Sequence, residues 1–324
     1  MIRDQKGCWL TPMAMFAVVC VMATAACRTT TEAPTETWDV SRAENLEWQP
    51  DDARFGQDFA LETSGLAYAG GKLWAPSEKY ARLLVISPGD GPSAQVVDIE
   101  VPTHAELEGL AVRDGRAYLC DEAHATVYRV DLEDGVGHYE GTGPEPLVAV
   151  ELPLVDVEVE AGKIGVEGIE VSLDGSALYV LLERSGDEST GCVSRIWRLH
   201  MEKGRLRLEG EPLEIPLEDC NWRLTGLAWD GPQLLGLKTQ YPGERYEIVE
   251  IDTQTGEIVV AQDLTAYLRG VRDDGWGNNA EGIAIDDDGA LWLIGDNAVT
   301  GVIDDPYPPP TDERALLLRI PRSK

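Results

Sequence analysis

Basic residues are scarce in this sequence, which has 27 Lys and Arg against 58 Asp and Glu and a formal net charge of −31. Nucleic acids are bound largely through Lys and Arg side chains that neutralise phosphates, and anionic lipid surfaces attract basic segments for the same reason. The composition therefore argues against nucleic acid as a partner and against direct docking on an anionic membrane. An acidic surface of this kind either serves solubility or attracts cations.

Several signatures of catalysis and nucleotide binding are absent. The sequence has no P-loop, no dinucleotide-binding glycine fingerprint, no zinc-ligand spacing and no Ser-His-Asp order. Histidine is rare, and only His104 and His124 are predicted on the face of the candidate site described below. A phosphate substrate would need a basic clamp, for which only Arg184 and Lys238 end inner strands there.

Hydrophobic runs are also short. The longest, over residues 13–26, is preceded by Arg3 and Lys6 and is too short to span a bilayer as a mature helix. Small residues end this run directly before Cys27, a pattern that resembles a bacterial lipobox. It predicts a lipoprotein-type signal peptide over residues 1–26 and lipidation of Cys27.

Residues 27–36 have nothing apolar to bury and are predicted to be a tether. The expected location is the bacterial outer membrane, either periplasmic or surface-exposed, with the lipid anchor as the sole membrane contact. Thr24 stands where a lipobox usually has Leu, and residues 23–25 also fit an ordinary cleavage site. A secreted protein is therefore the alternative.

Cysteine is limited to six residues, three of which lie at or before Cys27. Of the others, Cys192 falls in a loop within one repeat and Cys220 in the connection to the next, on the same predicted face. In an oxidising compartment this pair is able to form a disulfide. Cys120 ends an apolar strand and is predicted to be a buried free thiol.

A short sequence motif recurs five times in the rest of the chain. Each copy is an oxygen-bearing side chain, then Gly, then a branched apolar residue, followed within a few residues by a hairpin turn such as Asp114-Gly115. The five copies start 44 to 59 residues apart, at Ser64, Glu108, Glu167, Thr225 and Glu281.

A sheet-forming unit that recurs at this spacing is typical of a propeller blade. The fold class is therefore predicted to be all-β, a five-bladed β-propeller of four-stranded blades over residues 37–324. The last unit has only three strands, so its missing outer strand is expected from residues 37–48, which would close the ring at the N-terminus.

The first strand of each propeller blade lines the central tunnel, so the five repeated side chains should converge at one end of it. At a separation of about 5 Å and an effective dielectric of about 20, two carboxylates repel by roughly 3 kcal/mol. Either protons or a cation must relieve this repulsion among the three glutamates. Carboxylates, hydroxyls and carbonyls form an all-oxygen ligand set that suits Ca²⁺. In the alternative explanation, each Glu accepts backbone N–H bonds from the neighbouring blade and braces the ring.

The ordered five-fold set resembles the SdiA-regulated family of five-bladed propellers, and the segment 281–285 is similar to phytase-esterase-like propeller proteins. The resemblance spans about residues 60–322. It implies a tunnel calcium site at Ser64, Glu108, Glu167, Thr225 and Glu281 but does not specify an activity.

Two functions of different class follow. The first is a non-catalytic, calcium-binding scaffold or binding module that is tethered to the membrane. The second is a calcium-dependent esterase or phosphoesterase with its site at the tunnel mouth and His104 or His124 as the base. Both predict a monomer whose partner, a small molecule or a protein, binds at the tunnel face.

Overall fold

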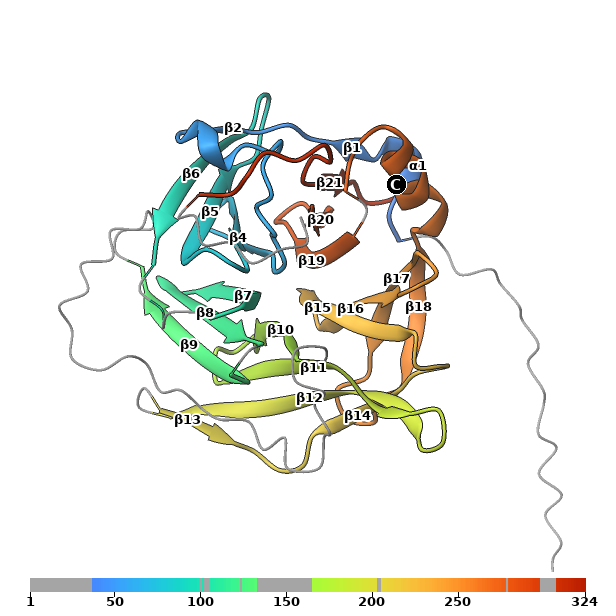
Figure 1. Cartoon of the computed structure of the whole chain (residues 1–324). Helices are drawn as coiled ribbons and strands as arrows, with labels where there is room; N and C mark the ends of the chain where they lie inside the picture. The colour runs from blue at the N-terminus through green and yellow to red at the C-terminus, as the bar shows by residue number, and fades with distance from the viewer. Residues whose placement is uncertain are drawn as a thin grey trace, which may run out of the picture. The chain divides into compact units, whose positions relative to one another are not determined.

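In the computed structural model, five small sheets are arranged as the blades of a ring, with their first strands innermost (Figure 1). The structure describes residues 37–99, 101, 105–122, 124–132, 165–202, 205–277, 279–297 and 307–324. This arrangement confirms the prediction of a five-bladed β-propeller. The predicted signal peptide and tether, with Cys27, lie outside the described residues.

The first three strands of each blade form an antiparallel meander in which consecutive strands pair. Blade one contains β3 (Ala67–Ala69), β4 (Lys72–Pro76), β5 (Arg82–Ser87) and β6 (Ser93–Asp98). Blade two contains β7 (Leu107–Arg113), β8 (Arg116–Asp121) and β9 (Thr126–Asp131). Blade three contains β10 (Val166–Val171), β11 (Ala177–Asp187), β12 (Gly191–Glu202), β13 (Arg205–Leu208) and β14 (Leu213–Pro216). Blade four contains β15 (Trp222–Asp230), β16 (Gln233–Gln240), β17 (Arg245–Ile251) and β18 (Ile258–Asp263). Blade five contains β19 (Asn279–Ile285), β20 (Leu291–Asp296) and β21 (Leu317–Ile320).

The N-terminal segment closes the ring. Strand β1 (Glu44–Asn45) pairs antiparallel with β21 of blade five, as the sequence predicts. Beyond it, β2 (Gln49–Pro50) pairs parallel with β6 of blade one, which the sequence did not predict. Two short 3-10 helices, η1 (Val40–Arg42) and η2 (Ala53–Phe55), flank these strands. The segment therefore covers the outer edges of both blades at the seam.

Two buried tryptophans anchor this closing segment. Trp38 packs with Leu264 and Leu268 between blades four and five, and its Nε1 donates a 3.0 Å hydrogen bond to the Gly289 carbonyl. Trp48 packs in a second cluster with residues of blades five and one. Burial of such a ring stabilises the fold by roughly 2 to 3 kcal/mol, so the short β1 pairing is not the sole attachment.

Two local features differ from the expectation. The predicted blades have four strands, but blade three has five, because β13 and β14 are separate strands that both pair with β12. Gly210, with φ of +70°, lies between them and interrupts the extended backbone. The connection from blade four to blade five contains the helix α1 (Thr265–Asp273), which the sequence analysis did not predict.

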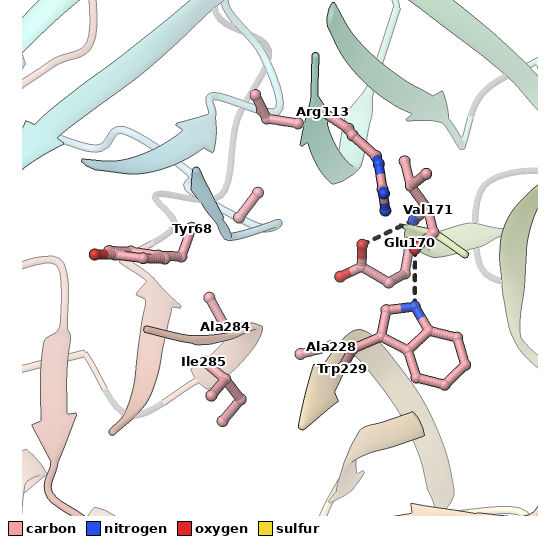
Figure 2. Close-up of a pocket in the computed structure, with 10 residues that line it drawn as sticks. Tyr68, Arg113, Glu170, Val171, Ala228, Trp229, Ala284 and Ile285 are labelled. Carbon is pink, nitrogen blue, oxygen red and sulfur yellow. Dashed lines mark hydrogen bonds between the residues drawn. The ribbon is translucent and has the colours of Figure 1, made fainter. Parts of the chain in front are cut away.

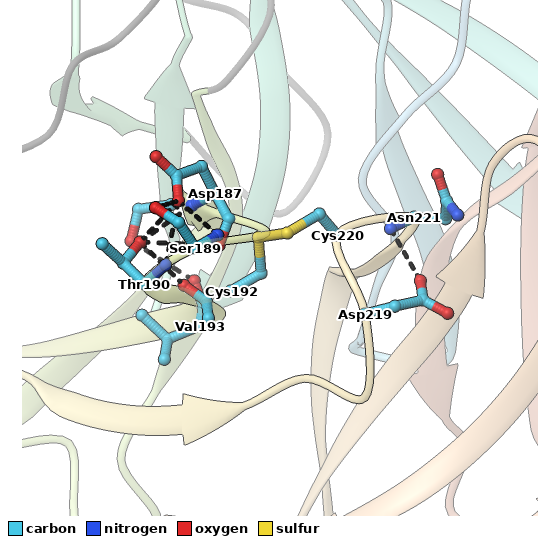
Figure 3. The surroundings of a disulfide bond; sticks show 10 residues. Asp187, Ser189, Thr190, Cys192, Val193, Asp219, Cys220 and Asn221 are labelled. Atoms are coloured by element: carbon cyan, nitrogen blue, oxygen red, sulfur yellow. Dashed lines mark hydrogen bonds between the residues drawn. A yellow bond between two sulfur atoms is a disulfide. The ribbon is translucent and has the colours of Figure 1, made fainter.

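A disulfide joins Cys192, at the start of β12, to Cys220, in the connection between blades three and four. Figure 3 shows it linking the 187–190 turn region to the loop that carries Asp219 and Asn221. The Cα atoms are 5.3 Å apart, within the usual range for this bond. Cys120 is a buried free thiol. No helix in the described part of the chain is both long and apolar enough to cross a membrane.

Candidate functional site

In blades two to five the repeated residue lies at a shift in the pairing register of the inner strand. In β10 the pairing jumps from Val166 to Gly168, which leaves Glu167 without a partner residue on β11. The same shift occurs at Thr225 in β15 and Glu281 in β19, and around Glu108 in β7. Such β-bulges bend a strand and redirect a side chain, and they are frequent beside functional sites. The glycine after each repeated residue was the signal in the sequence for these bulges.

The glycines of the repeat bring the five inner strands into close contact. A Cβ atom on Gly109 would lie 2.8 Å from the carbonyl oxygen of Glu167 in the next blade. On Gly282 it would lie 2.5 Å from the Ser64 carbonyl, which continues the ring from blade five to blade one. The strands enclose a cavity of about 10 Å³, with Glu167 and Thr225 in its wall. That space holds about one water molecule.

Four of the five repeated side chains have no hydrogen-bond partner within the described part of the chain. The Ser64 and Thr225 hydroxyls are both buried without a partner. Glu108 and Glu167 are also buried, and neither accepts a hydrogen bond from any described residue. The bracing explanation requires backbone N–H donors at these carboxylates, and the described residues provide none.

The three glutamates influence each other electrostatically. Burial raises the pKa of Glu108 well above its usual range, and the Glu167 carboxylate adds to this shift. Burial also raises the pKa of Glu167 well above its usual range, and repulsion from Glu183 adds to it. For Glu281, burial and Asp296 raise the pKa to about 8. For all three groups the surroundings therefore disfavour the ionised carboxylate, and a cation close to the carboxylates would offset this effect.

Arg223 is a built-in cation at this end of the tunnel. It lies on β15 and donates from Nη1 to Glu183 Oε1 at 2.8 Å, and its Nη2 lies 3.4 Å from Glu281 Oε1. Its Nε donates to the Thr239 hydroxyl at 3.1 Å. Arg223 therefore compensates carboxylates of blades three and five, on either side of its own blade. The sequence analysis missed it, although it stands only two positions before Thr225.

More carboxyl groups surround the mouth, at the positions where the second strands end. Burial raises the pKa of Glu122 to about 7, with Glu183 adding to the shift. Burial and Glu62 do the same for Asp296, also to about 7. Lys79 contacts Glu78 and lies 3.4 Å from Glu106 Oε1. The described cations at the mouth are fewer than the acidic groups, so this end of the tunnel favours positive charge.

Within the described ranges, no three His, Cys, Asp or Glu side chains are grouped closely enough to hold a metal ion by themselves. Two of the five repeated residues are hydroxyl-bearing and fall outside such a grouping, and Arg223 draws the Glu281 carboxyl to one side. The oxygen atoms available here are still of the type that a hard cation prefers, because the hydroxyls of Ser64 and Thr225 are buried without partners and the buried carboxyls of Glu108 and Glu167 accept no hydrogen bond from described residues.

The two candidate bases differ in outcome. His104 lies outside the described residues. His124 is half exposed, and its Nδ1 lies 2.8 Å from Oδ2 of the fully buried Asp121. Asp121 also accepts bonds from the Tyr128 hydroxyl at 2.8 Å and the Glu106 backbone N–H at 3.1 Å. These bonds hold Asp121 in place, and Asp121 orients the imidazole. The carboxylate of a catalytic triad orients its histidine in the same way.

Lys238 is not a clamp for phosphate. Its side chain is fully buried, and its Nζ donates to Glu218 at 2.6 Å and to Glu247 at 3.1 Å. Glu247 on β17 and Glu218 in the connection before β15 compensate its charge, so it presents no free ammonium to the tunnel mouth.

Comparisons with known proteins locate the chain within a family. The sequence model of the phytase-like family, described as "Esterase-like activity of phytase", matches residues 100–298. No curated protein gives a significant match. Among solved structures, the glutaminyl cyclase of Myxococcus xanthus is 16% identical with a TM-score of 0.48, and the match covers 87% of this chain and 97% of the cyclase chain. The PQQ-bound aldose sugar dehydrogenase of Streptomyces coelicolor is 13% identical with a TM-score of 0.45, covering 89% of this chain and 100% of its own. Both TM-scores are below 0.5, so neither enzyme's activity is transferred to this protein. The family match spans more than half of the 324 residues, and the chain belongs to the phytase-like family of propeller proteins.

Proposed function

We propose that this protein is a membrane-tethered propeller module that binds one Ca²⁺ at the tunnel end where the repeated residues converge. The ligands would come from the five repeated positions, Ser64, Glu108, Glu167, Thr225 and Glu281. The observation that carries the proposal is the set of buried oxygen atoms without partners at these positions.

The energetics favour an ion over an empty site. A buried hydroxyl without a partner costs about 1 to 3 kcal/mol, and the site contains two of them, on Ser64 and Thr225. Ionised glutamates without a counter-ion add repulsion between their charges. One hard cation relieves both costs, because oxygen donors of this kind are the ligands that Ca²⁺ prefers. Arg223 already compensates Glu281 in part, so Glu108 and Glu167 supply most of the uncompensated charge.

The test is a melting curve of the metal-stripped protein with calcium and with EGTA. A ligand at a hundredfold excess over its dissociation constant stabilises the folded state by about 2.7 kcal/mol. Calcium should therefore raise the melting temperature of the wild type, and Glu167→Gln should lose most of that response. Glu257→Gln, which changes an exposed glutamate far from the tunnel, is the matched control and should respond fully. Identical curves with calcium and EGTA, and no metal by mass spectrometry, would reject the site.

The membrane tether is a separate part of the proposal. It is supported by the small residues before Cys27 and by the polar composition of residues 27–36. The Cys27→Ser variant should leave the membrane fraction and appear as soluble protein. A mature N-terminus at a residue other than Cys27 would reject lipidation and favour the secreted alternative.

A second candidate function is favoured by the pair formed by Asp121 and His124. A histidine that is oriented by a buried carboxylate is suited to accept a proton from water. Bound Ca²⁺ would supply charge that polarises an ester or phosphoryl oxygen. The test is hydrolysis of p-nitrophenyl acetate and p-nitrophenyl phosphate, with His124→Gln as the variant. Turnover that requires both calcium and His124 would support a hydrolase, and equal rates in the wild type and the variant would exclude this role for His124.

A further inference from the structure

The opposite end of the tunnel has a cavity that the proposed cation site does not use. Two successive residues from each inner strand line it, three to five positions after the repeated residue of that strand. They are Ala67 and Tyr68, Val112 and Arg113, Glu170 and Val171, Ala228 and Trp229, and Ala284 and Ile285 (Figure 2). Its volume is about 200 Å³. The cavity is therefore built from all five blades and lies on the ring axis.

Glu170 is the acidic group of this cavity. Figure 2 shows its carboxyl directed into the open centre. One oxygen, Oε1, accepts a 2.8 Å bond from the Val171 backbone N–H, and no other described residue bonds to the carboxyl. Burial raises the pKa of Glu170 to about 8, against the opposing effects of the Val171 N–H bond and then of the Arg113 guanidinium. At neutral pH the group is mostly a neutral carboxylic acid, which is able to donate one hydrogen bond and accept others.

Arg113 forms the cationic wall, and it is held in place by the neighbouring blade. Its Nη1 donates to the Ser172 carbonyl and its Nη2 to the Leu173 carbonyl, both at 2.8 Å. These bonds connect blade two to blade three and leave further N–H groups of the guanidinium for a ligand, since Arg carries five donors.

The aromatic walls are also fixed. The Nε1 of Trp229 donates to the Val171 carbonyl at 2.8 Å, and its ring packs edge-on against Tyr179 at a centroid distance of 5.5 Å. Tyr68 lies on the far side of the cavity, and its hydroxyl contacts Asp287 Oδ2 at 3.2 Å. A cavity whose walls are held in this way needs little reorganisation to accept a ligand, which favours binding.

The charges select the class of ligand. A cation would be repelled by Arg113, which is fixed in the wall. An anion would meet the repulsion of a chain of net charge −31 and, above pH 8, of the ionised Glu170. A neutral compound with hydroxyl groups suits both polar side chains, because each hydroxyl both donates and accepts. Its C–H faces would contact the aromatic and aliphatic walls.

We propose that this cavity is a binding site for a neutral polyol of about one sugar ring, with Glu170 and Arg113 as its polar contacts and Trp229 and Tyr68 as its apolar walls. A single sugar ring agrees in size with the cavity, because a volume of about 200 Å³ is below the range of pockets that bind drug-sized ligands. The site is independent of the cation site, which lies at the other end of the tunnel.

Binding is measured by saturation-transfer NMR and calorimetry with three neutral probes, D-glucose, D-mannose and myo-inositol. D-glucosamine and D-glucuronate serve as the cationic and anionic comparisons. At least one neutral probe should bind saturably at millimolar concentrations, more tightly than either charged sugar. No saturable binding of any neutral probe, or tighter binding of a charged sugar, overturns the proposal.

The variants locate the ligand in the cavity. Glu170→Leu should weaken binding of the neutral probe at least tenfold, whereas Glu170→Gln, which keeps a donor and an acceptor, should bind within a few-fold of the wild type. Val259→Ser on the exposed edge strand β18 is the matched control and should not change binding. Unchanged affinity in a folded Glu170→Leu variant would overturn the assignment.

The pH profile gives a second readout that does not depend on Glu170→Leu folding. The charged and titratable groups around Glu170 are Arg113 from β7, Tyr68 from β3, Asp287 behind Tyr68, and Asp114, whose Oδ2 lies 3.8 Å from Arg113 Nε. Wild-type affinity should be flat below about pH 8 and fall above it, because the carboxyl loses its donor proton. Glu170→Gln should show no such fall. A parallel decrease in both proteins would overturn the role of Glu170.

Discussion

The close approach of the inner strands at Gly109 makes a specific prediction about stability. A Cβ atom at this position would lie 2.6 Å from Cys120 Sγ and 2.8 Å from both the Glu167 carbonyl oxygen and the Ile169 nitrogen. Two of these three atoms are backbone of the next blade, so a rotamer change cannot relieve the overlap. Overpacking of this kind costs about 1 to 3 kcal/mol and occasionally more. We expect Gly109→Ala to reach or exceed the upper end of that range.

Two further substitutions calibrate the effect. A Cβ on Gly168 meets the Leu181 side chain at 3.1 Å and the Gly226 Cα only at 3.5 Å, so Gly168→Ala should cost less than Gly109→Ala. Gly270 is an exposed position of helix α1 with nothing within 4 Å of a Cβ, so Gly270→Ala should stabilise by up to about 1 kcal/mol. Both substitutions add the same methyl group as Gly109→Ala, but the space available for that group differs.

The measurement is equilibrium urea unfolding of the three variants and the wild type, followed by tryptophan fluorescence. The expected order of stability is Gly270→Ala first, then the wild type, Gly168→Ala and Gly109→Ala. A Gly109→Ala protein as stable as the wild type would mean that the strands separate at little cost. In that case the repeated glycine would not be explained by close packing of the ring.

Three other predictions concern the rest of the molecule. Glu170→Gln should gain stability over the wild type as pH rises from 6 to 9, because a carboxyl whose pKa is raised to about 8 binds its proton more tightly when folded. The gain is on the order of 1 kcal/mol per pH unit until about pH 8. A difference in melting temperature between the two proteins that stays constant across this pH range would refute the prediction. Reduction of the disulfide between Cys192 and Cys220, which are 28 residues apart, should lower the free energy of unfolding in urea by roughly 3 to 4 kcal/mol. A Cys120→Ser variant, which keeps the disulfide, should show the same loss on reduction. Deletion of residues 37–48 should lower the melting temperature sharply, since it removes β1 and two buried tryptophan anchors, whereas deletion of 28–36 should not; equal tolerance of both would contradict the closure.

The sequence by itself determined the architecture. Alternating apolar strands and turn dipeptides are local signals, and their five-fold recurrence predicted the number of blades. The three-stranded last unit predicted that the N-terminus supplies a strand, which β1 does. The order of strands and loops along the repeats also placed Cys192 and Cys220 on one face, where they form a disulfide. These predictions succeeded because each depends only on spacing along the chain and on the rule that sheet edges must be covered.

The tertiary structure alone decided how side chains from different blades meet. Arg223 reaches Glu183 in blade three and Glu281 in blade five, 40 and 58 positions away, and no local pattern predicts such contacts. The bulges that turn the repeated residues into the tunnel depend on pairing register, and the cavity around Glu170 exists only because five strand ends surround one axis. The physical reason is that ring closure sets these distances, since one residue's charge partners and solvent exposure depend on every blade that faces it.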